Sequence, residues 1–387
     1  MARLGDLCTI VSGSTPKSNI PEYWDGDIKW ITPAELTEDT YIINDSVRHI
    51  TELGVAKTGL KPFPPGTVIL SSKAPIGTTA IAGCEMYCNQ GFKNLICSEH
   101  INPRYLYWFL TCNTEYLNSL GRGATFKEIS KEIVSNIEIP LPPIETQVEI
   151  SEKFEKISEL IALRKEQLAK LDQLVKSRFI ELFGDPVNNE MHWEKVPLSV
   201  CVESIDNGKS FVCDSVAREG EWPAILKLSA ATYGFYRPEE NKAVLDETQF
   251  VEDVAVRVGD LLFTRKNTPE LVGMCAYVYD TPSNLMMPDL IFRLNTTERC
   301  NKIFLWKLIN HDLFRGCIQA IATGSAKSMS NISKERLLNL EVILPPIKVQ
   351  KQFAAFVEQT DKLKLTIQSS LDKLEVLKKS LMQEYFG

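Results

Sequence analysis

A duplicated segment constrains the fold of this chain of 387 residues more than any other feature. Shifting the sequence by 203 positions lays residues 121–184 over residues 324–387 without a gap, and 23 of the 64 aligned positions are identical. Each copy contains Leu-Pro-Pro-Ile, then two further residues and a glutamine, and each copy ends in Phe-Gly. Self-similarity at a fixed period marks a repeated structural unit. The sequence therefore predicts two related halves.

The duplicated segment is predicted to form one long helix in each copy. Its paired prolines end the preceding extended stretch, and proline at the first helical position costs no hydrogen bond. Apolar residues then recur at alternating steps of three and four, as in a coiled-coil seam. The predicted seam residues are Ile157, Ile161, Leu168, Leu171, Val175 and Leu182 in the first copy and Ile367, Leu371, Leu374 and Leu381 in the second. Each helix would contain roughly 40 residues and be about 60 Å long.

The segments upstream of the two helices are predicted to be globular and of mixed α+β structure. Short β-branched runs alternate there with glycine and proline, which is typical of short strands joined by turns. Trp108 aligns with Trp306 at an offset of 198 residues, and Gly66 aligns with Gly259 at an offset of 193. The drifting offset indicates that these segments changed in length while the helical segments did not.

We therefore predict an α+β protein with a pseudo-two-fold internal repeat, in which two long antiparallel, coiled-coil-like helices separate two globular domains. Residues 1–140 and 185–343 would form the globular domains, and residues 141–184 and 344–387 the helices. Leu4 aligns with Leu198, so the end of the second copy leads naturally into the start of the chain. The obvious partner for the apolar seam of each helix is the other copy.

The composition is that of an ordinary globular protein, with 44% hydrophobic and 24% charged residues. The sequence contains no apolar run of about 18 residues, and its first residues are not typical of a signal peptide, so we expect a cytoplasmic protein without a membrane span. The net charge of −7 argues against a free-standing nucleic-acid binder. A local basic face, or a partner that contributes positive charge, is compatible with that value.

No motif in the sequence predicts catalysis. Methyltransferases that act on amino groups need Asn or Asp before Pro-Pro-Tyr/Phe, and the Leu-Pro-Pro-Ile copies lack that polar side chain. Residues 206–210 resemble the end of a phosphate-binding loop, but Glu203 stands where that loop needs glycine. A zinc site built from Cys84, Cys88 and Cys97 is an alternative to reduced, partly buried thiols. We expect a chain that is not an enzyme by itself and holds no metal.

Several stretches of the sequence resemble the specificity subunits of type I restriction–modification systems. They are "LGDLCTIVSGSTPKSNIPEYWDGDIKWITPAEL", "GTVILSSKAPIG", "NQGFKNL", and the two Leu-Pro-Pro-Ile-x-x-Gln helix entrances with their "FG" ends. The resemblance spans essentially the whole chain, including its length and its duplication. The second copy departs slightly, because it has Lys348-Val349-Gln350 where the family often carries an acidic residue before the glutamine.

The resemblance implies a role in DNA recognition. Each globular domain would be a target recognition domain that reads one half of a bipartite site in double-stranded DNA. The helices would set the spacing between the half-sites and dock two modification subunits. Those subunits would methylate adenine from S-adenosylmethionine, and restriction subunits would translocate and cleave DNA with ATP and magnesium, so this chain itself would bind no cofactor. Pseudo-two-fold proteins read paired half-sites at fixed spacing, which agrees with this interpretation.

Two sets of candidate site residues follow. Base readout needs Arg, Lys, Asn or Gln, while other basic residues neutralise phosphates. Loops after predicted strands and the loops before the helices supply the DNA-contact candidates Lys73, Asn89, Gln90, Lys93, Arg122 and Lys127 in the first copy and Arg265, Lys266, Asn267, Ser325 and Lys327 in the second. The candidates for spacing and partner docking are Leu141, Pro142, Pro143, Ile144 and Gln147 and their counterparts Leu344, Pro345, Pro346, Ile347 and Gln350.

Two other functions stay open at this point. The chain could be a scaffold of paired helices that binds no nucleic acid, which would suit its acidic character. It could also be the recognition module of a single-chain restriction–methylation enzyme, although the cofactor motifs of such an enzyme are missing.

Overall fold

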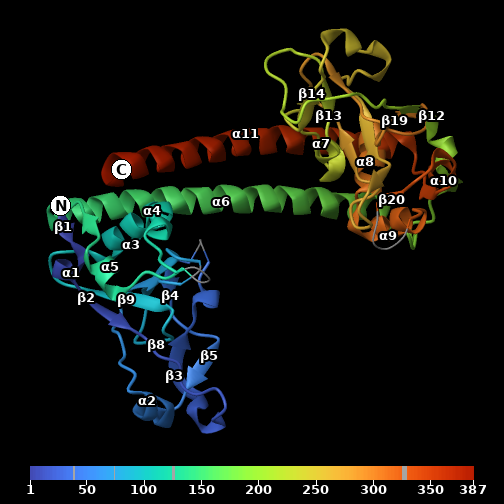
Figure 1. Ribbon diagram of the computed structural model, residues 1–387. Helices are drawn as coiled ribbons and strands as arrows, with labels where there is room; N and C mark the ends of the chain where they lie inside the picture. The colour runs from blue at the N-terminus through green and yellow to red at the C-terminus, as the bar shows by residue number, and fades with distance from the viewer. Residues whose placement is uncertain (38–39, 74, 124–126, 325–328) are drawn as a thin grey trace. The chain divides into compact units, whose positions relative to one another are not determined.

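The computed structural model describes residues 1–37, 40–73, 75–123, 127–324 and 329–387. These residues form two compact units (Figure 1). Unit 1 comprises Met1–Lys165 together with Ser369–Gly387, and unit 2 comprises Glu166–Gln368. Each unit therefore contains one globular domain, the beginning of one long helix and the end of the other.

The duplicated segment forms two helices of equal length. α6 (Ile144–Phe183) and α11 (Ile347–Phe386) contain 40 residues each, and they are drawn in green and red in Figure 1. Each helix begins directly after its pair of prolines. α6 ends before Gly184, whose φ of +71° is the left-handed conformation that commonly ends a helix and that glycine adopts without strain. The predicted long helices are therefore confirmed.

In unit 1 the two helices run in opposite directions. Near the start of α6, Phe154 stacks on Phe386 of α11 with ring centroids 5.7 Å apart. Further along α6, the Lys165 ammonium lies 3.8 Å from the carboxylate of Glu375, which precedes Phe386 in the chain. Trp108 of the globular domain stacks on the other side of the contact, 5.3 Å from Phe154. The end of α11 thus completes the core of unit 1.

Unit 2 repeats this arrangement with the helices exchanged. Phe183, near the end of α6, packs edge-on against Phe353 near the start of α11, with ring centroids 5.3 Å apart. Phe183 also packs against Phe304 of the globular domain at 4.8 Å, and Lys364 of α11 pairs with Asp172 of α6. Phe183 and Phe386 hold the same position in the repeat. Each globular domain is therefore closed by the helix end that the other repeat supplies.

Unit 1 is built on a mixed sheet with the strand order β2-β9-β6-β7-β4 among the described residues. A smaller sheet, β5-β3-β8, and the pair β1-β10 complete its strands. The strands are β1 (Ala2–Arg3), β2 (Cys8–Ser12), β3 (Trp24–Ile31), β4 (Ile42–Ile43), β5 (Arg48–Ile50), β6 (Val68–Ser71), β7 (Thr79–Ala82), β8 (Tyr87–Cys88), β9 (Phe92–Cys97) and β10 (Glu138–Ile139). The helices are α1 (Leu4–Leu7), α2 (Glu52–Thr58), α3 (Pro103–Cys112), α4 (Thr114–Ser119) and α5 (Lys131–Ser135).

The main sheet of unit 2 has the order β12-β19-β15-β17, and the smaller sheets are β14-β13-β18, β16-β20 and β11-β21. The strands are β11 (Lys195–Pro197), β12 (Val202–Asn207), β13 (Ala224–Leu226), β14 (Asn241–Ala243), β15 (Leu261–Thr264), β16 (Lys266–Asn267), β17 (Cys275–Tyr277), β18 (Leu285–Met286), β19 (Ile291–Thr296), β20 (Ser330–Asn331) and β21 (Glu341–Ile343). The helices are α7 (Ser229–Thr232), α8 (Lys302–Ile309), α9 (Asp312–Ala320) and α10 (Lys334–Leu338). Together the two units confirm the predicted α+β fold with two long antiparallel helices.

The helix faces differ in how well they are covered. Among the predicted seam residues, Ile157, Ile161, Val175 and Leu371 are buried, while Leu168, Leu171, Leu182, Ile367, Leu374 and Leu381 are half-buried. Other apolar residues of the two helices are exposed: Leu160, Leu163, Leu174 and Ile180 on α6, and Leu363, Leu365, Val376 and Leu377 on α11. The apolar surface of the helices is therefore larger than their mutual contact covers within the units.

Candidate nucleic-acid interface

A buried glutamine fastens the start of α6 to the globular domain of unit 1. The Gln147 side-chain carbonyl accepts a hydrogen bond from the backbone N–H of Asn102 at 2.9 Å. Its amide group donates to the carbonyls of His100 at 3.1 Å and Pro142 at 2.9 Å. Asn102 is the N-cap of α3, and its own side chain accepts hydrogen bonds from the first turn of that helix. One side chain thus joins the α6 entrance to the start of α3.

Unit 2 contains the same connection. Gln350 accepts a hydrogen bond from the backbone N–H of Asn301, the N-cap of α8, at 2.8 Å. Its amide donates to the carbonyls of Arg299 at 3.1 Å and Pro345 at 2.7 Å. Gln147 and Gln350 are both 0% exposed. Both side chains thus hold the helix entrances from within the units, and a direct contact with a partner through them stays a prediction.

The other predicted docking residues lie at different depths. Pro143, Ile144 and Pro346 are exposed, Leu141, Pro142 and Ile347 are half-buried, and Leu344 and Pro345 are buried. Leu344 packs into the core of unit 2, so its docking role and that of Pro345 stay predictions. Pro143, Ile144 and Pro346 are the most accessible of these positions to a partner.

In unit 1 two of the predicted DNA-contact residues contact the carboxylate of Glu128, and a third is bridged to Glu128 through the backbone. Lys73 follows β6, and its ammonium lies 3.5 Å from Glu128. Lys93, in the neighbouring strand β9, reaches the same carboxylate at 3.3 Å and donates to the Ser72 hydroxyl at 3.1 Å. Glu128 also forms a backbone bridge with Arg122, which is exposed. The backbone at Arg122 and Glu128 is therefore held next to Lys73, which follows β6.

At the equivalent backbone positions unit 2 keeps the lysine, as Lys266, but carries different side chains around it. Glu128 corresponds to Asn331, which pairs with Lys266 through β16 and β20 and forms a backbone bridge with Thr323. The guanidinium of Arg265 donates to the Asn331 side-chain carbonyl at 3.2 Å. The same guanidinium lies 5.1 Å from the ring of Phe292.

Strand register makes the correspondence explicit. Lys93 pairs with Leu70 across β9 and β6, and Phe292 pairs with Phe263 across β19 and β15. A lysine salt-bridged to a carboxylate in unit 1 is thus replaced by a phenylalanine beneath an arginine in unit 2. The two units therefore carry different side chains at equivalent backbone positions.

Two of the predicted DNA-contact residues are largely buried. The side chain of Lys93 is 7% exposed, and the residue Asn267 is 7% exposed. The Asn267 amide donates to the Thr232 hydroxyl at 3.0 Å, and its carbonyl accepts from the backbone N–H of Thr268. Both side chains therefore position their neighbours within the units, and their contact with DNA stays a prediction. Sequence cannot distinguish such positioning residues from contact residues, because both are polar residues beside strand ends.

The remaining candidates are more accessible. Lys73, Asn89, Arg265 and Lys266 are half-buried, and Gln90, Arg122 and Lys127 are exposed. Asn89 accepts a hydrogen bond from the backbone N–H of Gly91, and Gln90 is bonded to the hydroxyl of Thr15. Ser325 and Lys327 lie outside the residues that the structure describes.

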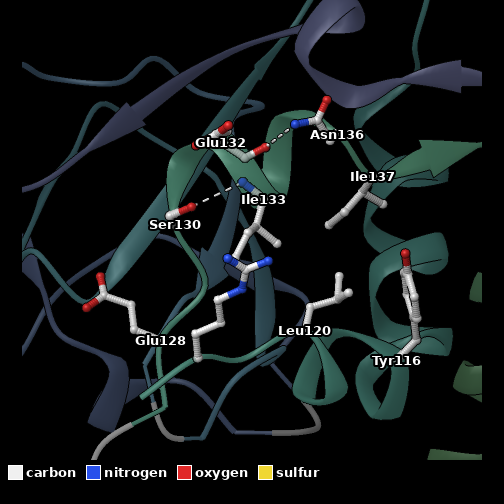
Figure 2. A pocket seen from close by; sticks show the side chains of 9 residues that line it. Tyr116, Leu120, Glu128, Ser130, Glu132, Ile133, Asn136 and Ile137 are labelled. Atoms are coloured by element: carbon white, nitrogen blue, oxygen red, sulfur yellow. Dashed lines mark hydrogen bonds between the residues drawn. The ribbon is translucent and has the colours of Figure 1, made fainter.

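Beside the Arg122–Glu128 bridge, unit 1 carries an open hollow of about 630 Å³. Figure 2 shows Tyr116 and Leu120 on one side of it and Ile133 on α5 opposite, where the Ser130 hydroxyl caps the helix by accepting from the Ile133 N–H. Ile133 corresponds to Arg336 in unit 2, whose guanidinium donates to a main-chain carbonyl, that of Ile321, at 3.3 Å. The two units therefore also differ beside their loops.

Two exposed aromatic residues beside an arginine in unit 2 were not predicted from the sequence. Tyr233 and Phe235, directly after α7 in unit 2, are 51% and 50% exposed. The guanidinium of Arg237 lies 4.6 Å from the centroid of each ring. In unit 1, by contrast, Trp24 and Trp30 are buried. The pattern Tyr-x-Phe-x-Arg is the only sequence signal for this feature, and it does not reveal exposure.

Within the described residues, no three His, Cys, Asp or Glu side chains gather as a metal site would require. The Cys84 thiol donates a hydrogen bond to the carbonyl of Asn44, whereas the Cys88 sulfur accepts one from the side-chain amide of Asn94. Cys84 and Cys88, two of the cysteines considered for a zinc site, therefore have different neighbours. Burial raises the pKa of the Cys88 thiol to about 12, which keeps it protonated. Among the helices described, none combines the length and apolar character that crossing a membrane demands.

These observations define a class of protein: a duplicated chain that presents two structurally equivalent, chemically distinct polar surfaces. The model of the type I restriction modification DNA specificity domain matches residues 1–173 and again residues 193–378. The chain belongs to this family.

Individual relatives agree with the assignment. The MjaIX specificity subunit of Methanocaldococcus jannaschii is 38% identical over 193 residues, which span 49% of this chain and 45% of that relative. The EcoKI specificity subunit of Escherichia coli is 23% identical over 86% of this chain and 76% of its own length. The crystal structure of the type I S subunit from M. genitalium matches with a TM-score of 0.63 at 14% identity, covering 100% of this chain and 95% of that one. This last likeness concerns the fold alone.

Proposed function

We propose that the chain is the DNA-sequence recognition subunit of a type I restriction–modification complex, in which unit 1 and unit 2 each read one half of a bipartite, asymmetric site. The observation that carries the proposal is a pair of equivalent backbone bridges in which both units keep a lysine and the residue opposite that lysine differs. Lys73 and Glu128 occupy in unit 1 the positions that Lys266 and Asn331 occupy in unit 2. Equivalent placement with different donors and acceptors suits two half-sites of different sequence, because base edges are distinguished by their donor and acceptor patterns.

Two modification subunits would dock on the long helices. Leu160 and Leu363 occupy the same position in the two copies, as do Leu174 and Leu377. All four are between 37% and 49% exposed. Unit 1 contains Leu160 and Leu377, whereas unit 2 contains Leu363 and Leu174. Each unit therefore offers the same pair of exposed leucines, which supports two equivalent docking sites.

The two leucines of a unit lie at the same level along the helix pair. In unit 1 the contacts of Lys153 with Tyr385 and of Lys165 with Glu375 bracket Leu160 and Leu377. Exposed apolar residues repeated in this way favour a protein partner over solvent. The exposed prolines and Ile144 at the helix entrances would extend the docking surface.

Catalysis would be left to the partner subunits. The modification subunits would bind S-adenosylmethionine and methylate adenine, and the restriction subunits would use ATP and magnesium. This chain would supply the sequence specificity and bind neither cofactor. Its net charge of −7 suits such a division, because the partners would share the neutralisation of DNA phosphates.

The proposal is tested by copurifying the chain with its modification subunits and mapping the adenines that the complex methylates. The expected result is methylation within one asymmetric bipartite sequence, with binding to that duplex that weakens steeply as salt rises. Methylation without sequence preference contradicts the proposal. A complex without DNA affinity at low salt favours the scaffold alternative, and crosslinking of S-adenosylmethionine to the isolated chain favours the single-chain enzyme.

A further inference from the structure

We propose that residues 233–237 of unit 2, named here the aromatic turn, form a direct DNA contact that determines recognition of the half-site read by unit 2. The inference rests on the proposed function and names the surface through which unit 2 would act. Two half-exposed rings, Tyr233 and Phe235, and the Arg237 guanidinium between them carry it.

The backbone of the aromatic turn is held firmly although its side chains are exposed. The Trp306 indole N–H donates to the Gly234 carbonyl at 2.9 Å, and the Arg237 N–H donates to the Ala230 carbonyl at 2.9 Å. Gly234 has a φ of +85°, which favours glycine, and a Cβ there would lie 3.2 Å from the Asn310 amide nitrogen. Exposed rings on a fixed backbone lose little conformational freedom on binding.

The aromatic turn adjoins the residues of unit 2 that are predicted to contact DNA at β16. Asn267, which follows Arg265 and Lys266 in the chain, donates its amide hydrogen to the Thr232 hydroxyl at 3.0 Å. Thr232 is the last residue of α7 and precedes Tyr233 directly. The segment that contains Arg265, Lys266 and Asn267 therefore helps to fix the position of the aromatic turn. This connection gives a physical role to the buried Asn267 side chain.

The charge of the turn favours DNA over a protein partner. Arg237 has no carboxylate or other hydrogen-bond partner for its guanidinium within the described part of the chain. The guanidinium lies beside both rings, and contact of this kind leaves the planar edge that carries its N–H donors available for a ligand. Such an edge fits a phosphate or the O6 and N7 atoms of guanine, and the rings fit the apolar faces of bases or sugars. An unpaired arginine is notable in a chain of net charge −7.

Unit 1 shows that an arginine beside aromatic rings does not create such a surface by itself. There the Arg48 guanidinium lies 3.7 Å from the Trp24 ring, but Trp24 and Trp30 are buried. Their indole N–H groups donate to the carbonyls of Lys17 and Ser14. The exposed version in unit 2 would therefore act on one half-site only.

The test uses the chain assembled with its modification subunits and duplexes that carry the methylated sequence found for the unaltered complex. Affinity is measured for the cognate duplex and for two duplexes in which one or the other half-site is scrambled. The variants are Tyr233→Ala with Phe235→Ala, Arg237→Ala, and Gly234→Ala, which keeps all three side chains but strains the turn. Leu313→Ala removes an equally exposed apolar side chain from α9 of the same unit and serves as the control.

We expect each turn variant to lower the affinity for the cognate duplex by about tenfold or more. The variant complexes should no longer distinguish the cognate duplex from the duplex in which the half-site of unit 2 is scrambled. They should still distinguish it from the duplex in which the other half-site is scrambled. Arg237→Ala should also reduce the slope of log affinity against log salt by about one. Wild-type affinity of the turn variants, with the unaltered complex still specific, overturns the inference. Weaker subunit association with unchanged discrimination also overturns it, in favour of a protein contact. A lack of specificity in the unaltered complex contradicts the proposed function instead.

Discussion

The side-chain carbonyl of Gln147 accepts a hydrogen bond from the backbone N–H of Asn102 at 2.9 Å, so the start of a helix of 40 residues is fixed to the cap of a short helix in the globular domain. Gln350 and Asn301 repeat the relationship in unit 2. The duplicated Leu-Pro-Pro-Ile-x-x-Gln sequence thus encodes a defined connection. If the globular domains bind DNA and the long helices set the distance between them, this connection fixes the position of each DNA-binding surface relative to its helix.

Replacing Gln147 should therefore weaken unit 1. Gln147→Met keeps the volume but leaves the Asn102 N–H and two carbonyls without partners in a buried site, at a cost of about 1–3 kcal/mol for each unsatisfied group. Thermal unfolding of unit 1 measured with Gln147→Met should show a clear loss of stability. Glu145→Ala, at an exposed position of the same helix turn, should change little. Equal effects of the two substitutions would contradict the assigned role.

Lys93 and Glu128 should be energetically coupled. Glu128→Asn leaves the nearly buried Lys93 ammonium without its carboxylate and should destabilise unit 1 by about 1–3 kcal/mol. Adding Lys93→Phe installs the side chains that unit 2 carries at these positions and removes the unpaired charge. A double-mutant cycle from urea unfolding should show that the second substitution recovers part of the loss. Strictly additive effects would exclude the coupling.

The exposed leucines should control partner stoichiometry. Leu160→Lys with Leu377→Lys alters unit 1 only, and Leu363→Lys with Leu174→Lys alters unit 2 only. Each pair should reduce the number of bound modification subunits from two to one in native mass spectrometry while leaving the fold intact, because these side chains are exposed. Leu365→Lys provides the control, since its counterpart in the other copy is Ala162. Two subunits bound to every variant would exclude these leucines from docking.

Acid should destabilise unit 2 through His311. Burial lowers the pKa of this imidazole below its ordinary value, and the neighbouring Asp312 opposes the shift while Lys176 adds to it. The unfolded chain therefore takes up the proton first as pH falls, so stability is lost progressively below about pH 6.5. Unfolding free energies on either side of that pH should show the loss.

The matched variant for this test is His311→Asn. The imidazole of His311 accepts a hydrogen bond from the backbone N–H of Leu313, and asparagine keeps a helix-capping acceptor without titrating. The variant should lose less stability between neutral and acidic pH than the unaltered chain does. His100→Asn, at an exposed position, should retain the full acid sensitivity. An unchanged pH dependence in His311→Asn would rule out this histidine as the source.

The sequence predicted the helices because their signals are local. Paired prolines mark each start, Gly184 marks an end, and the apolar spacing between them indicates the buried face. It could not predict the partners of Gln147, because Asn102 lies 45 residues away and no local pattern links them. That connection depends on how α3 and α6 meet in the folded unit.

The candidate site was predicted less completely for a related reason. Lys93 belongs to β9, whose first four residues are all buried, so the usual alternation of inward and outward side chains does not apply. Asn267 has the same composition and loop context as a base-contact residue, yet it bonds to Thr232. Exposure of Tyr233 and Phe235 likewise depends on what packs around them. Residue type indicated the chemistry of the surface. Only the folded structure shows which polar residues are exposed and which position their neighbours.

Domain exchange tests the central claim most directly. Residues 1–140 are replaced by the equivalent segment of another family member, and methylated adenines are mapped in a host that carries the exchanged chain with the modification subunits. The account predicts that one half-site changes its sequence while the other half-site and the distance between them stay the same. A change in both half-sites, or an altered distance with both half-site sequences retained, would contradict the division of labour between the globular domains and the long helices.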